Sequence, residues 1–175
     1  AETENSTQGV IGELPIYASA DEASMEKGVV RYNGSVHINT GDINVQADEA
    51  TYYIDADTIK LKGSIDISNP ELNLRGDQAS IDLANDSQEI SAAEYLIADG
   101  NMQGKADHIS IDQAGTTRIK DGSYTRCMPN NKVWEVRASD ITLDRVNGQG
   151  KAKHARLKLY GAPVFYLPYA QFPIG

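Results

Sequence analysis

A four-residue pattern of a small residue, an aspartate, any residue and an apolar residue occurs four times in this chain. The four copies span Ala20–Ala23, Ala47–Ala50, Gly76–Ala79 and Ala106–Ile109. Their first residues lie 27, 29 and 30 residues apart, and a second series of small residues keeps a similar step at Gly34, Gly63, Ala93 and Gly122. A period near 30 residues predicts short structural units that bury their apolar faces only by stacking on their neighbours.

Between these landmarks the chain alternates apolar and polar residues, which is typical of β-strands with one buried face. Turn-forming residues separate the runs, for example at 39–42 and 68–71. The sequence therefore predicts an all-β fold of stacked strands whose apolar sides face one another across an elongated interior. The small residue before each aspartate suits a tight corner. The alternation slips near Ile90 and Ile119, which we interpret as bulges or corners.

The apolar positions of this alternation are the candidate inward residues of the fold. They are Val36, Ile38, Ile43, Val45, Tyr52, Ile54, Ile65, Ile67, Leu72, Leu74, Ile81, Leu83, Ile109, Ile111, Trp134 and Val136. A long track of Ile, Val and Leu suits acyl chains, because each methylene removed from water contributes about 0.8 kcal/mol. A carrier must also release its lipid, so it needs a long uniform track of this kind and no deep specific pocket.

Charge is distributed unevenly along the chain. The net charge is −9, which argues against general binding of nucleic acid through its phosphates. No Asp or Glu follows Asp144, and the last 31 residues carry five cations, which leaves −14 on residues 1–144. These cations are Arg145, Lys151, Lys153, Arg156 and Lys158. They indicate either a solvated basic strand or a surface for a partner or an anionic head group.

The sequence offers no catalytic, metal or cofactor site. The repeated aspartates are spread one per unit, and the three histidines lie far apart without metal-ligand spacing. We therefore predict a protein that is not an enzyme and needs no metal or cofactor. Its single cysteine, Cys127, is either a small buried residue or pairs with another chain or a domain absent here.

Several segments carry a resemblance to a known family. They are Cys127–Met128–Pro129 followed by Trp134, the run Gly148–Ala152, the tail Pro163–Gly175, and the repeats with Gly34–Ser35–Val36 and Ala47–Ala50. From about Leu14 onward the chain resembles the N-terminal periplasmic domain of the LptD family of lipopolysaccharide-assembly proteins. The repeats are similar to the OstA-like module that LptA and LptD share.

This resemblance implies an open, V-shaped β-jellyroll of stacked antiparallel strands with an apolar interior groove. Residues 1–13 would be a flexible segment, 14–160 the jellyroll, and 161–175 the connector to an outer-membrane β-barrel. The domain would lie on the periplasmic side of the outer membrane of a Gram-negative bacterium. Lipid A acyl chains of lipopolysaccharide would contact the inward residues named above.

The resemblance also implies partners. These are an LptA-like bridge, the chain's own barrel with its LptE lipoprotein plug, and a disulfide from Cys127 to that barrel. We expect the bridge to add a strand to the N-terminal edge of the sheet, at roughly residues 29–38.

Two other classes of protein fit the repeat. A structural or adhesive β-solenoid would stack end to end and would have no affinity for lipid. A β-helix acting on polysaccharide would show clustered Asp, Arg and Lys in one exterior groove, and we find no such cluster in the sequence.

Overall fold

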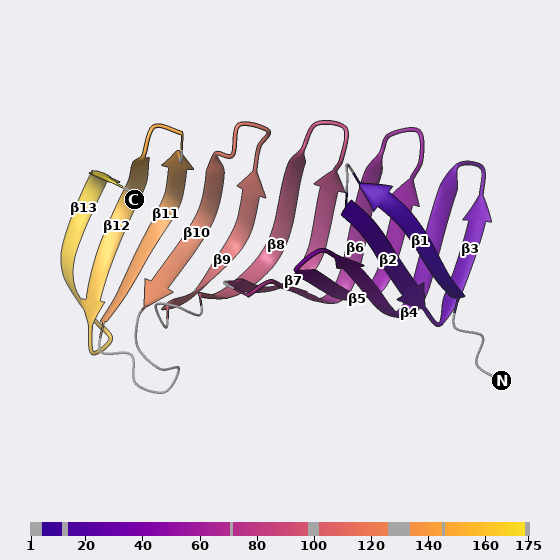
Figure 1. Ribbon diagram of the computed structural model, residues 1–175. Helices are drawn as coiled ribbons and strands as arrows, with labels where there is room; N and C mark the ends of the chain where they lie inside the picture. The colour runs from indigo at the N-terminus through magenta and orange to yellow at the C-terminus, as the bar shows by residue number, and fades with distance from the viewer. Residues whose placement is uncertain are drawn as a thin grey trace.

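The computed structural model describes residues 5–11, 14–70, 72–97, 102–125, 134–144 and 146–173. All its regular elements are β-strands, and they form one antiparallel sheet that is not closed. Each strand pairs with the next one along the chain, except that β2 and β3 both pair with β4 (Figure 1). This arrangement confirms the predicted fold class, an open, V-shaped β-jellyroll of stacked antiparallel strands.

The strands are β1 Asn5–Ile11, β2 Leu14–Ala20, β3 Glu22–Glu26, β4 Val29–Thr40, β5 Ile43–Tyr53, β6 Thr58–Ser68, β7 Leu72–Asp82, β8 Ser87–Ile97, β9 Met102–Ile111, β10 Thr117–Thr125, β11 Trp134–Asp144, β12 Gln149–Leu159 and β13 Ala162–Pro173.

The long strands bend near their middle, and the bends form one line across the sheet. We call the half of each strand above this line in Figure 1 the upper arm, and the other half the lower arm. The upper arm ends at turns such as 54–57 and 83–86, and the lower arm at turns such as 41–42. The repeated unit of the sequence is thus one strand up and one strand down.

The repeated tetrapeptide is the bend itself. In β5, Ala47 and Ala50 are both buried although they lie three residues apart, and the two residues between them are exposed. A regular strand would place positions three apart on opposite faces, so one extra outward residue forms a β-bulge here. Gly76 and Ala79 in β7, and Ala106 and Ile109 in β9, repeat this spacing of buried positions.

The alternate strands bend in two ways, which explains the slip in the apolar pattern. Leu61 of β6 and Ile90 of β8 both pair with Ala79 of β7, so they occupy equivalent inward positions. The next buried position follows four residues later in β6, at Ile65, but three residues later in β8, at Ala93. The bend of β8 is one residue shorter, and the interpretation of the slip as a corner is confirmed.

The longer bends use glycine followed by serine. Gly34 and Ser35 of β4 have φ of 78° and 46°, the left-handed region that glycine enters at little cost. A side chain on Gly34 would also meet the carboxylate of Asp21, whose Oδ2 lies 2.6 Å from the position that a Cβ would take. The backbone N–H of Asp21 donates to the Gly34 carbonyl at 2.9 Å, which ties the repeated aspartate to the facing bend.

The upper turns are held by aspartate side chains. Asp82 accepts hydrogen bonds from the side-chain amide and the backbone N–H of Asn85, at 2.8 and 3.1 Å. Asp144 and Asn147 form the same two hydrogen bonds two repeats further along the chain. These bonds favour the ionised carboxylate and therefore lower the pKa of Asp82 and of Asp144.

The N-terminal edge differs from our expectation. Residues 29–38 belong to β4, which pairs with β5 on one side and with β2 and β3 on the other, so they are not an edge. The strands β2 and β3 are the two arms of one strand broken at Asp21. The edge is therefore β1 on the lower arm and β3 on the upper arm.

The two end segments of the chain also contain strands. Residues 5–11, within the segment expected to be flexible, form β1, and most of the expected connector forms β13. The division of the chain into domains itself stays a prediction. Among the described residues there is no helix that could cross a membrane.

Candidate functional site: the interior of the sheet

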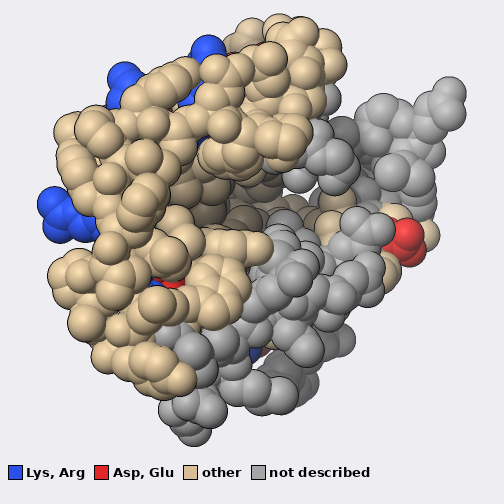
Figure 2. Space-filling model, turned by 90° about the vertical axis from the view of Figure 1, so that its left-hand side faces the viewer, with Lys and Arg blue, Asp and Glu red and all other residues tan. Residues whose placement is uncertain are grey.

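The inner face of the bent sheet is lined by apolar side chains from every long strand. The buried core runs along the line of bends and includes Val36, Val45, Leu61, Ile65, Ile90 and Ile109 together with a row of alanines. Ile38, Ile59, Ile67, Leu74, Ile81, Tyr95 and Ile119 pack against this core and are only partly buried. The space-filling view of the β13 end shows a hollow at its centre (Figure 2).

Most of the predicted inward residues lie where the alternation placed them. Val36, Val45, Ile65 and Ile109 are buried, with 1, 7, 2 and 9% of their surface exposed. Ile38, Ile67, Leu74 and Ile81 pack on this core, and Tyr52, Leu83, Ile111, Trp134 and Val136 are half-buried.

Three of the predicted residues have a different environment or only a backbone description. Ile43 and Ile54 lie at strand ends and are 41 and 39% exposed, so they border the interior more than they fill it. Leu72 begins β7 opposite Ile97, and its side chain is outside the described part of the structure. Cys127 also falls outside the described residues, and its disulfide to another domain stays a prediction.

Sequence reasoning missed some of the best-buried positions. Leu61 and Ile90 are 2 and 5% exposed, yet neither was among the predicted inward residues. Counting back by two from Ala93 misses Ile90, because two residues intervene between these inward positions. Leu61 lies four residues before Ile65, so counting by two does reach it, but the predicted set in β6 began at Ile65. A count that allows two intervening residues before Ala93 and Gly122 would have found Ile90 and Ile119, and simple alternation from Ala93 reaches Tyr95.

The register of the strands joins the inward residues into continuous rows. On the lower arm one row pairs Ile38, Val45, Ile67, Leu74, Tyr95, Gly104, Tyr124, Val136, Leu157 and Phe165, in order from β4 to β13. No charged residue interrupts it. Ten strands at the usual spacing make this row roughly 43 Å long.

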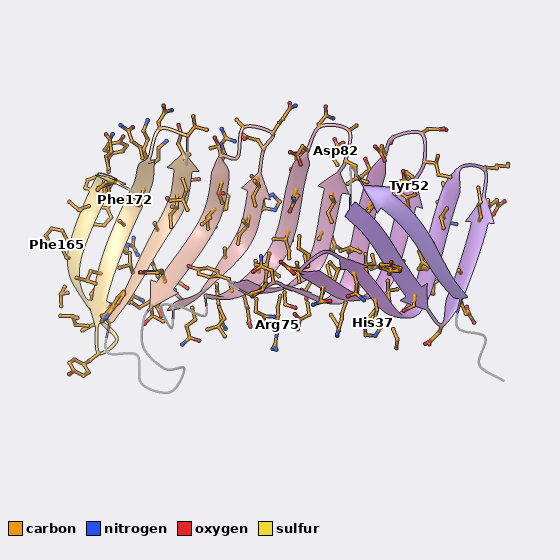
Figure 3. All side chains as sticks on the ribbon, viewed as in Figure 1. His37, Tyr52, Arg75, Asp82, Phe165 and Phe172 are labelled. Atoms are coloured by element: carbon orange, nitrogen blue, oxygen red, sulfur yellow. The ribbon has the colours of Figure 1, made fainter. Side chains whose placement is uncertain are left out.

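A second row lies above the line of bends. It pairs Tyr32, Ala50, Leu61, Ala79, Ile90, Ile109, Ile119, Ile141, Ala152 and Ala170. Both rows end at β13, the upper one at Ala170 and the lower one at Phe165. Phe172 lies two residues beyond Ala170 on the upper arm of β13 (Figure 3).

In the lower row, the aromatic side chain of Tyr95 lies across Gly104 of the neighbouring strand. The Tyr95 hydroxyl donates to the Ser123 carbonyl at 2.9 Å, reaching from β8 over Gly104 of β9 to β10. Lys105 N–H donates instead to Ser123 Oγ at 3.2 Å. Burial raises the pKa of Tyr95 to about 12. The neighbouring Tyr124 ring lies 5.6 Å from Trp134, so aromatic rings line this part of the interior.

The outer face is polar and held by exposed ion pairs. Arg75 and Asp66 lie 3.5 Å apart, Lys105 and Glu94 3.5 Å, and Lys120 and Asp140 3.2 Å. Exposed pairs of this kind contribute about 0–1 kcal/mol each. Among the residues that the structure describes, no group of three or more His, Cys, Asp or Glu side chains could hold a metal ion.

An open antiparallel sheet, bent along one line, apolar inside and charged outside, defines the class: an elongated, unclosed β-jellyroll. The family model described as "LptA/(LptD N-terminal domain) LPS transport protein" matches residues 15–149. The chain therefore belongs to this family of lipopolysaccharide transport proteins.

Curated relatives extend the match over nearly the whole chain. The LPS-assembly protein LptD of Marinobacter nauticus is 42% identical over 168 residues, which are 95% of this chain and 21% of that protein. LptD of Pseudomonas aeruginosa is 37% identical over 164 residues, 93% of this chain and 18% of that protein. The chain thus spans about a fifth of the length of these relatives.

A solved structure supports the fold independently. The crystal structure of LptH, described as the LptA homologous periplasmic component of the lipopolysaccharide transport device of Pseudomonas aeruginosa, aligns with a TM-score of 0.50. The alignment covers 57% of this chain and 76% of LptH at 17% identity. At that identity the likeness concerns the fold alone.

Proposed function

We propose that this chain is the periplasmic domain of an outer-membrane lipopolysaccharide translocon, and that its interior shields lipid A acyl chains in transit. The observation that carries the proposal is the lower row of inward residues, which stays free of charge from β4 to β13. The family to which the chain belongs supports the role in lipopolysaccharide transport. The domain acts without catalysis.

The physical chemistry of the rows fits transport more than storage. An acyl chain in contact with them is removed from water, at about 0.8 kcal/mol per methylene. Neighbouring strands present similar Ile, Leu, Val and aromatic surfaces, so a chain that moves by one strand exchanges one set of contacts for an equivalent set. The unclosed sheet leaves one side for the polar head group, which would remain in water.

The two edges of the sheet fit the expected partners. An LptA-like bridge could add a strand to β1 or β3, because an edge strand offers unpaired backbone N–H and C=O groups. At the other end, β13 would lead toward the outer-membrane barrel with its LptE plug, to which Cys127 would be linked. The two rows of inward residues would then form part of a continuous apolar surface from the bridge to the barrel.

Binding to deacylated lipopolysaccharide tests this function. The purified chain should bind intact lipopolysaccharide in size-exclusion or sedimentation assays. It should bind the form stripped of its acyl chains at least about tenfold more weakly, because even two lost methylene contacts are worth this factor. Equal binding of both forms would show that the sugar and phosphate groups are recognised, and that the interior is not the lipid site.

The strand pairing of the sheet also bears on the two alternative classes, a β-helix acting on polysaccharide and a structural β-solenoid. A parallel β-helix acting on polysaccharide does not fit, since every pairing of the described strands is antiparallel. A structural β-solenoid keeps one supporting observation, the open edges at β1 and β13. A protein of this class would form polymers at high concentration and would bind neither form of lipopolysaccharide.

A further inference from the structure

The last two strands carry an unusual concentration of exposed apolar side chains. Of the fourteen large hydrophobic side chains that are exposed among the described residues, eight lie between residues 159 and 172. Tyr166 and Tyr169 are 49 and 52% exposed, and both lie on the outer face of β13. Exposed aromatic surface concentrated in one place indicates an interaction site.

Cations lie on the same outer face, directly beside these tyrosines. Arg156 pairs with Tyr166 and Lys153 with Tyr169 in the register of β12 and β13. The Arg156 guanidinium lies 5.8 Å from the centre of the Tyr166 ring, and the Tyr166 hydroxyl is 2.7 Å from Nδ1 of His154. Two cations of β12 therefore lie side by side with two aromatic rings of β13.

The charge of this face is positive on an otherwise acidic protein. We define the basic face as Lys153, Arg156, Lys158, Tyr166 and Tyr169. No Asp or Glu occurs in β12 or β13, and no ion pair involves the three cations within the described ranges. In the view of the β13 end, Lys and Arg project from one outer side of the molecule (Figure 2).

A neighbouring cleft extends the face but is mixed in charge. It has a volume of about 610 Å³, and its charged and titratable lining residues are Arg137, His154, Arg156, Lys158, Lys105, Glu94, Asp107 and Asp121. Arg137 is already paired with Glu135 at 2.6 Å. The three carboxylates in this lining disfavour a single small anion held in the cleft. The favourable charge is instead spread along β12, as a surface and not a pocket.

We propose that the basic face binds the surface of an anionic phospholipid bilayer. Tyrosine rings partition to the head-group level of a membrane, where both the apolar ring and the hydroxyl are satisfied. Lysine and arginine near an anionic leaflet each contribute about 1 kcal/mol, and this attraction falls off within a Debye length. The net charge of −9 repels the rest of the chain from such a surface, so the molecule would approach it only by the β13 end. This proposal does not require that the interior carries lipid.

Binding to vesicles tests the charge requirement. The whole chain should bind vesicles of phosphatidylethanolamine with phosphatidylglycerol, release them at high salt, and ignore vesicles of phosphatidylcholine. The combined change Lys153→Gln, Arg156→Gln and Lys158→Gln should weaken binding at least tenfold, roughly as three surface cations imply. Circular dichroism checks that the variant keeps its strands.

A matched control carries the same loss of charge at the other end of the sheet. Lys27, Arg31 and Lys62 are all exposed, and their combined change to glutamine should leave vesicle binding at or slightly below that of the wild type. An equal loss in both variants would overturn the proposal, since binding would then follow net charge alone. Equal binding to neutral vesicles would also overturn it, as would displacement by inorganic phosphate at constant ionic strength, which would indicate a simple anion site.

How deeply the tyrosines of the basic face insert into the bilayer tests the proposal independently. Tryptophan fluorescence of a Tyr166→Trp variant should be quenched by brominated lipids in anionic vesicles, whereas a Tyr53→Trp variant should show only the background of Trp134. Tyr53 is a suitable control because it also lies beside a cation, with Lys60 Nζ 5.5 Å from its ring centre. Equal quenching at the two positions, or none at position 166, would contradict docking through this face. A chain that passes these tests but ignores lipid A would keep the docking surface and lose only the proposed transport role.

Discussion

Replacing Gly104 by alanine is expected to lower the melting temperature by roughly 6–12 °C, because about 3 kcal/mol of stability is lost. A Cβ on Gly104 would fall on the Ser123 carbonyl oxygen and on the Tyr95 ring. The ring would have to leave its position, and the partly buried Tyr95 would lose the hydrogen bond from its hydroxyl to that carbonyl. Thermal unfolding followed by circular dichroism measures the effect.

Gly115→Ala is the matched control for this change. Nothing lies within 4 Å of the position that a Cβ would take on Gly115, but its φ is 80°. The substitution therefore costs only the free energy of placing alanine in the left-handed backbone region, roughly 1–2 kcal/mol. If Gly104→Ala melts at or above the temperature of Gly115→Ala, the close crossing of Tyr95 over β9 is wrong.

The substitution Leu61→Asn is expected to destabilise the fold by about 4 kcal/mol. The neighbouring substitution Lys62→Asn should change stability by less than about 0.5 kcal/mol. The two residues are adjacent in β6 but point to opposite faces. Leu61 is 2% exposed and lies in the row above the bends, and Lys62 is exposed on the outer face. Urea unfolding of both variants gives the comparison.

Equal losses of stability in Leu61→Asn and Lys62→Asn would contradict the assignment of Leu61 to the inner face and Lys62 to the outer face. The comparison is informative because the predicted inward residues of β6 began at Ile65 and did not include Leu61 across the bend. Within one arm the faces follow from alternation, which is a local property of a strand. Across a bend they depend on whether two or three residues intervene.

The number of residues at a bend could not be predicted from composition. In β4 and β6 a glycine marks the bend, and both it and the following serine have positive φ. In β8, β10 and β12 a single residue takes this conformation, and it is Ala92, Asp121 or His154. None of these three residues favours the left-handed region as glycine does, so tertiary pairing imposes it on them. The repeat predicted that a bend occurs, but only the register showed its length.

The N-terminal edge was misjudged for a related reason. The segment Asn5–Ile11 lacks the repeat landmarks, and it becomes an edge strand through its pairing with β2. That pairing is set by the end of the sheet and not by a periodic pattern in the strand. The residues expected to form the edge, 29–38, instead have neighbours on both sides.

The central claim is that acyl chains of lipopolysaccharide lie against the inner face of this sheet, and site-specific photo-crosslinking tests it most directly. Ile67 and Leu74 pair across β6 and β7 in the lower row, while Asp66 and Asn73 lie on the outer face of the same strands, with Asn73 Nδ2 donating to Asp66 Oδ1 at 2.8 Å. A photo-reactive residue introduced at position 67 or 74 should crosslink to lipopolysaccharide, and one at position 66 or 73 should not. Equal labelling at the four positions, or labelling confined to 66 and 73, would contradict the account.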